Sequence, residues 1–236
     1  MKHRALAFAL ALATTLAPAL SHASPVHAQA SLGTDAPLML SLRGDVELPG
    51  RLRVMAAGGF APTAYVNVIN NVLSAGGGGQ SGGGLYGIHV DSASAWRVHA
   101  GWRPFAGAGL VLMGGYGRLD LAGSASARDV ITSVTGVAPP SGIPEANGMY
   151  DVSSTLHMLD AELGWEFLLF DDHLVIQTAV GVGATMAAHT TITPRFASTT
   201  PGAAAARTQA QNHVDDTLRS YGVVPTISLS LGYRFF

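Results

Sequence analysis

The chain has 236 residues, of which 12% are charged and 48% hydrophobic, with 29 glycines, no cysteine and a formal net charge of −2. The mean hydropathy is +0.30. A typical soluble domain carries about 25% charged residues, so this composition excludes an ordinary cytosolic enzyme and a disordered tail. Beyond the N-terminus no run approaches the roughly 20 apolar residues that a membrane-spanning helix needs, which excludes a helical membrane protein. The absence of cysteine excludes disulfides and Cys-based metal or redox sites.

The first thirty residues have the layout of a secretory signal peptide. Lys2 and Arg4 form a short positive region, and an Ala/Leu-rich run covers residues 5–20. Small residues suited to signal-peptidase cleavage follow this run. The sequence therefore predicts export across the inner membrane.

Cleavage is expected after Ala30, with Ala28 and Ala23 as alternatives. The predicted domains are then a cleaved signal peptide at residues 1–30 and a single domain at residues 31–236. This second part contains no lysine, and its acidic residues outnumber its arginines, so nothing favours a nucleic-acid partner.

The rest of the chain repeats a period of two, in which apolar and polar residues alternate. Strict alternation over this length predicts strands with one apolar and one polar face. The segments with this pattern are residues 38–48, 51–60, 96–103, 109–121, 156–169, 174–186 and 226–236. In residues 109–121 apolar side chains compete for both faces, so the face of that strand stays open.

Two hairpins allow a check of the register. Pro-Gly at positions 49 and 50 and Asp-Asp at positions 171 and 172 are turn sequences. With tight loops there, charges of opposite sign and apolar faces fall opposite one another. The expected pairs are Glu47 with Arg51, Asp45 with Arg53, Trp165 with Thr178 and Leu163 with Val180.

Residues 64–73 fit two structures. Val66, Val68 and Val72 have the spacing of a strand, whereas Tyr65 and Ile69, together with Val72, have the spacing of a helix. If the strands close into a barrel of the bacterial single-chain type, their number is even, which favours a strand here and a total of eight, within a range of six to ten.

The residue types on the two faces of the strands predict whether each face meets lipid or the barrel interior. The apolar face carries aromatic residues toward the strand ends, as expected of a girdle at a lipid interface, and the girdle residues are Trp96, Trp102, Trp165 and Phe167. The polar face combines charges with Gly, Ala and Thr, which suits a narrow barrel interior better than the dry core of a soluble sandwich. In hydrocarbon, strands satisfy their backbone only by closing. The predicted fold is an all-β, closed, antiparallel, up-and-down transmembrane barrel.

The C-terminal strand carries a recognisable motif. In residues 226–236 apolar side chains alternate up to Tyr233 and Phe235, and Phe236 follows out of phase. This resembles the last strand of the bacterial outer-membrane β-barrel family, which includes small OmpA-like and OmpW-like barrels. The resemblance implies location in the bacterial outer membrane, contact with its lipid, and recognition of Tyr233, Phe235 and Phe236 by the barrel-assembly machinery during biogenesis.

Loop lengths predict the orientation of the barrel. Bacterial barrels have short periplasmic turns and long extracellular loops. The connections at residues 104–107 and 170–172 are short, whereas 122–153 and 194–216 are long. The short turns are therefore expected to face the periplasm.

Charged residues of both signs share the inward parity, and all the cations among them are arginines. An eight-stranded barrel is just wide enough to be filled by side chains, so these groups are expected to form a salt-bridged plug. The alternative is a narrow ion path. The predicted lumen network consists of Arg43, Asp45, Glu47, Arg53, Arg97, Arg103, Asp160, Glu162, Glu166 and Arg234.

No motif for catalysis or for a cofactor emerges. The Gly-rich residues 76–84 lack the Lys-Ser/Thr of a phosphate-binding loop, and the histidines lack metal-ligand spacing. His157 is expected on the lipid face, where outer-membrane lipid hydrolases carry a Ser-His pair. Ser153 lies four residues away, which is roughly 13 Å along a strand and too far for a general base.

Three functions are therefore ranked. The first is a non-enzymatic small outer-membrane barrel with a structural or surface-interaction role, without cofactor or metal. The second is a narrow channel or small-solute transporter, and the third a lipid hydrolase acting through His157. The extracellular partner stays open.

Overall fold

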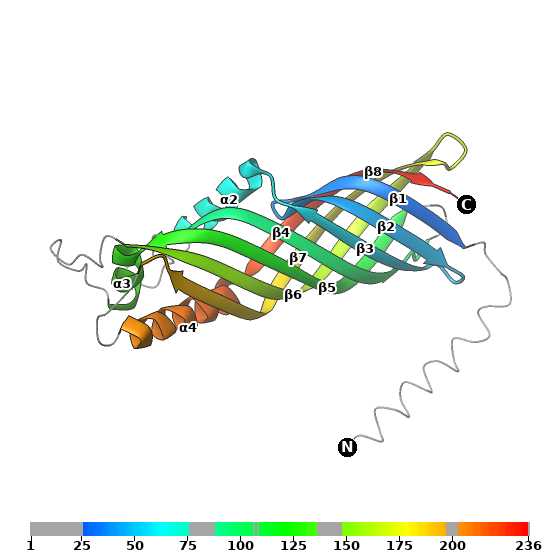
Figure 1. Ribbon diagram of the computed structural model, residues 1–236. Helices are drawn as coiled ribbons and strands as arrows, with labels where there is room; N and C mark the ends of the chain where they lie inside the picture. The colour runs from blue at the N-terminus through cyan, green and yellow to red at the C-terminus, as the bar shows by residue number, and fades with distance from the viewer. Residues whose placement is uncertain are drawn as a thin grey trace, which may run out of the picture.

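Eight antiparallel strands close into a barrel in the computed structural model, which describes residues 26–75, 88–105, 107, 109–135, 148–196 and 203–235. Each strand pairs with its neighbours in the chain, and β1 pairs with β8 (Figure 1). The strands are β1 (His27–Ala36), β2 (Met39–Leu48), β3 (Leu52–Phe60), β4 (Ile88–Trp102), β5 (Leu110–Ser126), β6 (Met149–Leu169), β7 (Leu174–Pro194) and β8 (Val223–Arg234). The connections contain the helices α2 (Thr63–Ala75), α3 (Ala127–Thr135) and α4 (Ala203–Tyr221). The predicted all-β, up-and-down barrel of eight strands is confirmed.

One strand lies elsewhere than predicted. Residues 64–73 belong to helix α2, so the prediction of a strand there is wrong, and the eighth strand is β1. Val66 is buried and Ile69 packs against the same apolar cluster, as residues one helical turn apart do. The side chain of Asn70 also bonds the backbone N and O of Val90, at 2.8 and 3.0 Å, which ties the helix to β4.

Strand β1 extends beyond the boundary expected after Ala30. It begins at His27, and Ala30 lies opposite Tyr233 in the seam that closes the barrel. The Phe235 N–H donates to the carbonyl of Ala28 at 2.9 Å. Residues on the N-terminal side of the expected boundary therefore contribute to ring closure, while residues 1–25 lie outside the described part.

The β2–β3 hairpin differs from its predicted register. Glu47 lies opposite Arg53 instead of Arg51, and Asp45 lies opposite Met55. Its loop ends one residue later than expected, because both Gly50 and Arg51 adopt a left-handed conformation, with φ of 82° and 65°. The shift amounts to two positions, so every side chain keeps its predicted face.

The two ends of the barrel are built differently. The β2–β3, β4–β5 and β6–β7 turns lie at one end, the turn end, and the helices lie at the other, the helix end (Figure 1). The β6–β7 hairpin has the predicted register, with Trp165 opposite Thr178 and Leu163 opposite Val180.

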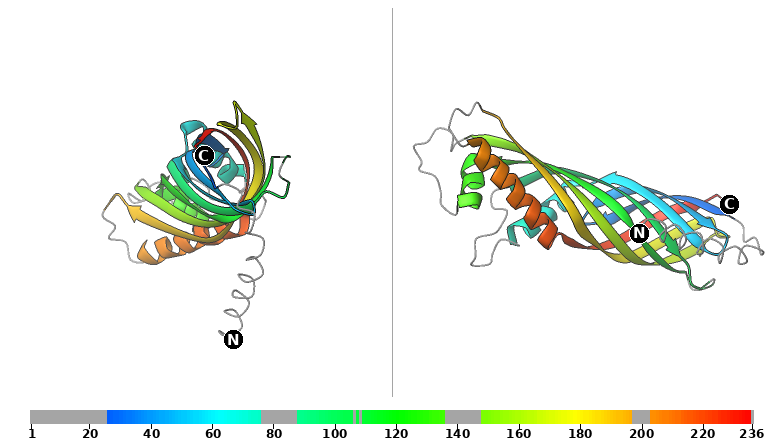
Figure 2. Two further views of the ribbon diagram at one scale, coloured as in Figure 1. Left: turned by 90° about the vertical axis from the view of Figure 1, so that its right-hand side faces the viewer. Right: turned by 90° about the horizontal axis from the view of Figure 1, so that it is seen from below.

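At the helix end, β5, β6 and β7 continue past the shorter strands, and α4 lies along this extension (Figure 2). The β5–β6 connection is shorter than the predicted loop at 122–153, because β5 continues to Ser126 and β6 begins at Met149, and it contains α3. The β7–β8 connection extends beyond the predicted loop at 194–216, because β8 begins only at Val223, and it contains α4. The Gly-rich residues 76–84 lie outside the described part.

The interior of the barrel changes character along its axis. On β4, Val90 and Ala93 lie toward the helix end and Arg97 toward the turn end, and on β6 Leu156 precedes Glu162 in the same way. Strand β5 turns Val111, Met113 and Leu119 inward, which settles its face. The apolar layer consists of Met39, Val66, Val90, Ala93, Leu119, Leu121, Leu156, Met158, Val214 and Leu218, the last two from α4.

Candidate functional site

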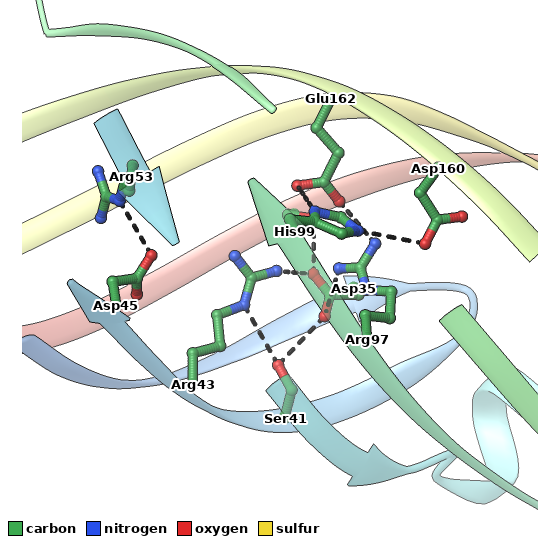
Figure 3. Close-up of polar contacts among 10 residues, drawn as sticks. Asp35, Ser41, Arg43, Asp45, Arg53, Arg97, His99, Asp160 and Glu162 are labelled. Carbon is green, nitrogen blue, oxygen red and sulfur yellow. Dashed lines mark hydrogen bonds and ion pairs between the residues drawn. The ribbon is translucent and has the colours of Figure 1, made fainter. Parts of the chain in front are cut away.

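All ten residues of the predicted lumen network point into the barrel, from β2, β3, β4, β6 and β8, with Arg103 directly after β4. Nine of them are buried and Glu47 is partly so; Arg43, Arg53 and Arg97 each expose only 2% of their surface. Two further residues, Asp35 and His99, belong to the same network (Figure 3). These twelve residues form the charged layer of the interior.

The part of the charged layer nearest the turns is organised around Glu166. Three guanidinium groups contact its carboxylate, from Arg53 at 2.5 Å, Arg103 at 2.5 Å and Arg234 at 2.6 Å. Arg53 also binds Asp45 at 3.0 Å, and Arg103 binds Glu47 at 2.9 Å. This turn-end cluster holds three acids and three arginines: Asp45, Glu47, Glu166, Arg53, Arg103 and Arg234. Its formal charges therefore balance.

The second part of the layer, the middle cluster, is built around Asp35. One carboxylate oxygen contacts Arg43 and accepts a hydrogen bond from Ser228 at 2.6 Å, and the other lies 2.9 Å from Arg97. Arg97 bridges onward to Glu162 at 2.6 Å. Asp35 is fully buried, so these contacts replace the water that its carboxylate loses.

His99 joins the middle cluster to two acids of β6. Its Nε2 lies 3.3 Å from Asp160 and its Nδ1 lies 3.8 Å from Glu162 (Figure 3). Glycines make room for these carboxylates, because a Cβ on Gly183 would come within 2.6 Å of Asp160, and one on Gly117 within 2.9 Å. The small residues of the polar face thus have a packing role.

The sequence contained a signal for both residues that its interpretation missed. Asp35 ends a period of two with Gln29 and Ser31 in β1, but that segment overlaps the expected signal peptide. His99 has the same inward parity as Arg97, and only its side-chain contact with Asp160 of β6, a strand with which β4 does not pair, makes it part of the network.

Aromatic residues of the predicted girdle lie on the outer wall. Trp96, Trp102, Trp165 and Phe167 all point outward and are exposed, as are Tyr233 and Phe235 of the predicted assembly motif. Phe236 lies outside the described residues. Their roles at a lipid interface and in assembly remain predictions.

His157 also lies on the outer wall, where its Nδ1 contacts the hydroxyl of Tyr116. In the described part of the chain, Ser153 makes no hydrogen bond to this imidazole. Among the same residues, no group of three or more His, Asp or Glu side chains is placed to hold a metal ion, and no helix is both long and apolar enough to cross a membrane.

Comparisons with known proteins find likeness in solved structures. No family model matches the sequence, and no curated protein does. A major outer membrane protein from Thermus thermophilus is 11% identical, with a TM-score of 0.48, over 90% of this chain and 100% of that one. Acinetobacter baumannii CarO2 and CarO are 11% and 12% identical, with TM-scores of 0.43 and 0.41, over 91% and 90% of this chain and 100% and 98% of theirs. The eight-stranded ring itself is established by the strand pairing of this chain.

Proposed function

We propose that this chain is a small bacterial outer-membrane β-barrel with a closed interior, which serves as a structural or surface-interaction element. The observation that carries the proposal is the distribution of side chains, which is the reverse of that in a soluble protein: charged groups lie inside the barrel and apolar groups outside. Twelve charged or ionisable side chains fill the interior, whereas β1, β2, β3 and β8 expose no Arg, Asp or Glu on their outward faces. In water such an apolar wall would drive aggregation, while in a bilayer it meets its natural solvent.

The exposed outer side chains match this assignment. Leu32, Leu42, Phe60 and Ile227 expose between 63% and 69% of their surface, and an outward-facing apolar band is what a barrel in a bilayer presents to lipid. A closed barrel also leaves no unpaired strand edge in the hydrocarbon.

The contacts in the charged layer and the burial of the apolar layer favour a filled interior and argue against an ion path. Each arginine of the charged layer contacts at least one carboxylate, and Met39 above it is fully buried. We therefore expect no single-channel conductance from the purified barrel in a planar bilayer. Steady discrete openings would favour the channel alternative.

Fractionation tests the main proposal. The mature protein is expected in the outer-membrane fraction, soluble only with detergent, and with an electrophoretic mobility that changes on heating, as closed barrels show. Recovery as a soluble periplasmic monomer would overturn it.

Orientation is tested by single cysteines, because the chain contains none of its own. Gln209→Cys places a thiol on the exposed part of α4, and Gly107→Cys places one in the β4–β5 turn, where a Cβ meets nothing within 4 Å. On intact cells an impermeant maleimide should label the first and spare the second. The reverse pattern would place the helix end in the periplasm.

The signal-peptide cleavage site belongs to the same proposal. Of the three candidate sites, cleavage after Ala23 leaves β1 whole. Cleavage after Ala28 removes residues that pair with β2, and cleavage after Ala30 also removes residues that pair with β8. The intact mass of the mature protein distinguishes these sites, and a chain that begins at Ser24 is expected.

A further inference from the structure

Two features of the outer wall lie side by side and together have the form of a site for an amphiphile. One is an apolar hollow of about 460 Å³ over β1 to β4. Four small residues that line it, here termed the floor, are Ala30, Gly44, Ala56 and Gly58, and Leu42 and Trp96 line it as well. The floor residues are cross-strand neighbours or nearly so, since Ala30 lies opposite Gly44 and Gly44 opposite Ala56.

The second feature is a polar cluster on β5 and β6. Arg118 donates from Nε and Nη2 to Asp120, at 2.8 to 3.0 Å, and Asp120 also accepts from Thr155 at 2.7 Å. His157 lies opposite Arg118 in the sheet and contacts the hydroxyl of Tyr116. The headgroup cluster is Tyr116, Arg118, Asp120, Thr155 and His157.

Trp96 joins the two features. It lines the hollow, lies opposite Arg118 in the β4–β5 pairing, and its ring centroid is 5.5 Å from that of Tyr116. Gly44 and Ala56, in the floor, lie nearer the turn end than Leu42 and Gly58 on their own strands. The hollow therefore runs from the polar cluster toward the middle of the apolar wall.

The chemistry of the headgroup cluster favours an anion. Its carboxylate, Asp120, already accepts from Arg118 and Thr155, so the charged group left to meet a ligand is the guanidinium of Arg118. Among the described residues Arg118 donates through Nε and Nη2 only, which leaves Nη1 available to a ligand, and the side chain is 41% exposed. A cation on the lipid face costs about 2–4 kcal/mol at the bilayer midplane, so this pair belongs at the headgroup level.

We propose that this site binds one molecule of a phosphate-bearing membrane lipid, with the phosphate on Arg118 and an acyl chain in the hollow. The inference rests on the proposed outer-membrane function. Arg118 would supply a charge-assisted hydrogen bond to a phosphate oxygen, and the indole of Trp96 would cover the start of the chain. The specific ligand is thus distinguished from bulk lipid by its phosphate and by its fit to the floor of small residues.

The test compares lipid retention by native mass spectrometry of the detergent-solubilised barrel. The probes are dioleoylphosphatidylglycerol and dioleoylglycerol, which share their acyl chains and differ in the phosphate. Wild type should retain the phosphate-bearing lipid preferentially. Arg118→Gln should lower that retention about tenfold, the loss expected for one hydrogen bond to a charged group. Retention of the phosphate-free lipid should not change.

Gly44→Leu should abolish retention of both lipids, because a Cβ on Gly44 meets nothing within 4 Å and the larger side chain would occupy the hollow. Ala30→Leu is a second variant that fills the hollow if the first fails to fold. The matched controls are Arg195→Gln, an exposed arginine at the helix end, and Gly114→Leu, an outward glycine outside the hollow. Both should behave as wild type.

The outcomes separate this inference from the proposed function. If a detergent-dependent, heat-modifiable barrel retains both lipids equally, or if Arg118→Gln and the hollow-filling variants bind as the controls do, the site is refuted and the barrel assignment stands. A protein that stays soluble and monomeric without detergent would refute the barrel assignment itself.

Discussion

The turn end and the helix end of this barrel close the same interior by different means. At the turn end the connections are short, no helix among the described residues covers the opening, and the turn-end cluster brings together charged side chains from five strands or their ends. At the helix end Val66 of α2 and Val214 and Leu218 of α4 pack against apolar strand residues. The side chains that fill a barrel therefore depend on what covers each end.

The charged layer and the apolar layer should also respond differently to substitutions. Removing one partner from a buried ion pair leaves the other charge desolvated and unpaired. Removing an apolar side chain leaves a cavity, which the neighbours can partly fill. We therefore expect the charged layer to control the integrity of the barrel and the apolar layer to control the docking of the helices.

Glu166→Gln should have the largest effect, because it leaves three buried arginines around a neutral amide. A loss of about 3–5 kcal/mol in the free energy of unfolding is expected. The measurement is the urea dependence of the folded, unheated band in detergent. Glu47→Gln, at the partly exposed edge of the same cluster, is the control, and an equal loss in both variants would contradict the central role of Glu166.

Leu218→Ala should act on α4 and leave the barrel intact. The buried side chain belongs to the apolar layer, and its truncation should weaken helix docking by about 2–4 kcal/mol. Limited proteolysis should then cut within α4 while the heat-modifiable band persists. Arg219→Ala, on the exposed side of the same helix, should resist cleavage as wild type does. A fall in barrel stability as large as that of Glu166→Gln would show that the apolar layer also controls the integrity of the barrel.

Arg97→Lys should have a smaller effect within the charged layer. Arg97 contacts Asp35 and Glu162 through different nitrogens of one planar group, at 2.9 and 2.6 Å, and an ammonium group cannot reproduce that geometry. The loss of one charge-assisted bond should cost about 1.5–3 kcal/mol in the same unfolding assay. Unchanged stability would mean that the network needs only positive charge, not the guanidinium shape.

Sequence alternation predicted the faces of the strands because every second side chain points the same way. It therefore placed Arg97, Glu162 and Glu166 inside and Trp165 outside before any pairing was known. It failed where that period was weak. β1 consists largely of small residues and adjoins the predicted signal peptide, and the α2 segment is too short for its periodicity to separate helix from strand.

Contacts across the interior could not be predicted in the same way. Asp35 meets Arg97, and Arg53 meets Glu166, although these residues are far apart in the chain and come from strands that are not neighbours. Such contacts depend on the stagger of the closed sheet, which alternation alone does not determine. The same holds for the hollow on the outer wall, whose small residues become a site only when four strands are aligned.

Breaking an ion pair outside both layers should have the smallest effect on stability, because the two groups are not buried. Arg195 donates to Asp151 at 2.5 and 2.9 Å on the exposed helix end, and this hydrogen bond lowers the pKa of the Asp151 carboxyl below its ordinary value. Because the folded pKa is lowered, any stabilisation is present above the ordinary Asp value and disappears as the pH falls through the lowered one. Both groups are solvated, so Asp151→Asn should leave the unfolding midpoint at neutral pH unchanged. Titration of the Asp151 carboxyl by NMR should show the lowered pKa, and Arg195→Gln should restore it. If Asp151→Asn instead destabilised the barrel as Glu166→Gln does, burial would not be what distinguishes the charged layer from the ion pairs on the surface.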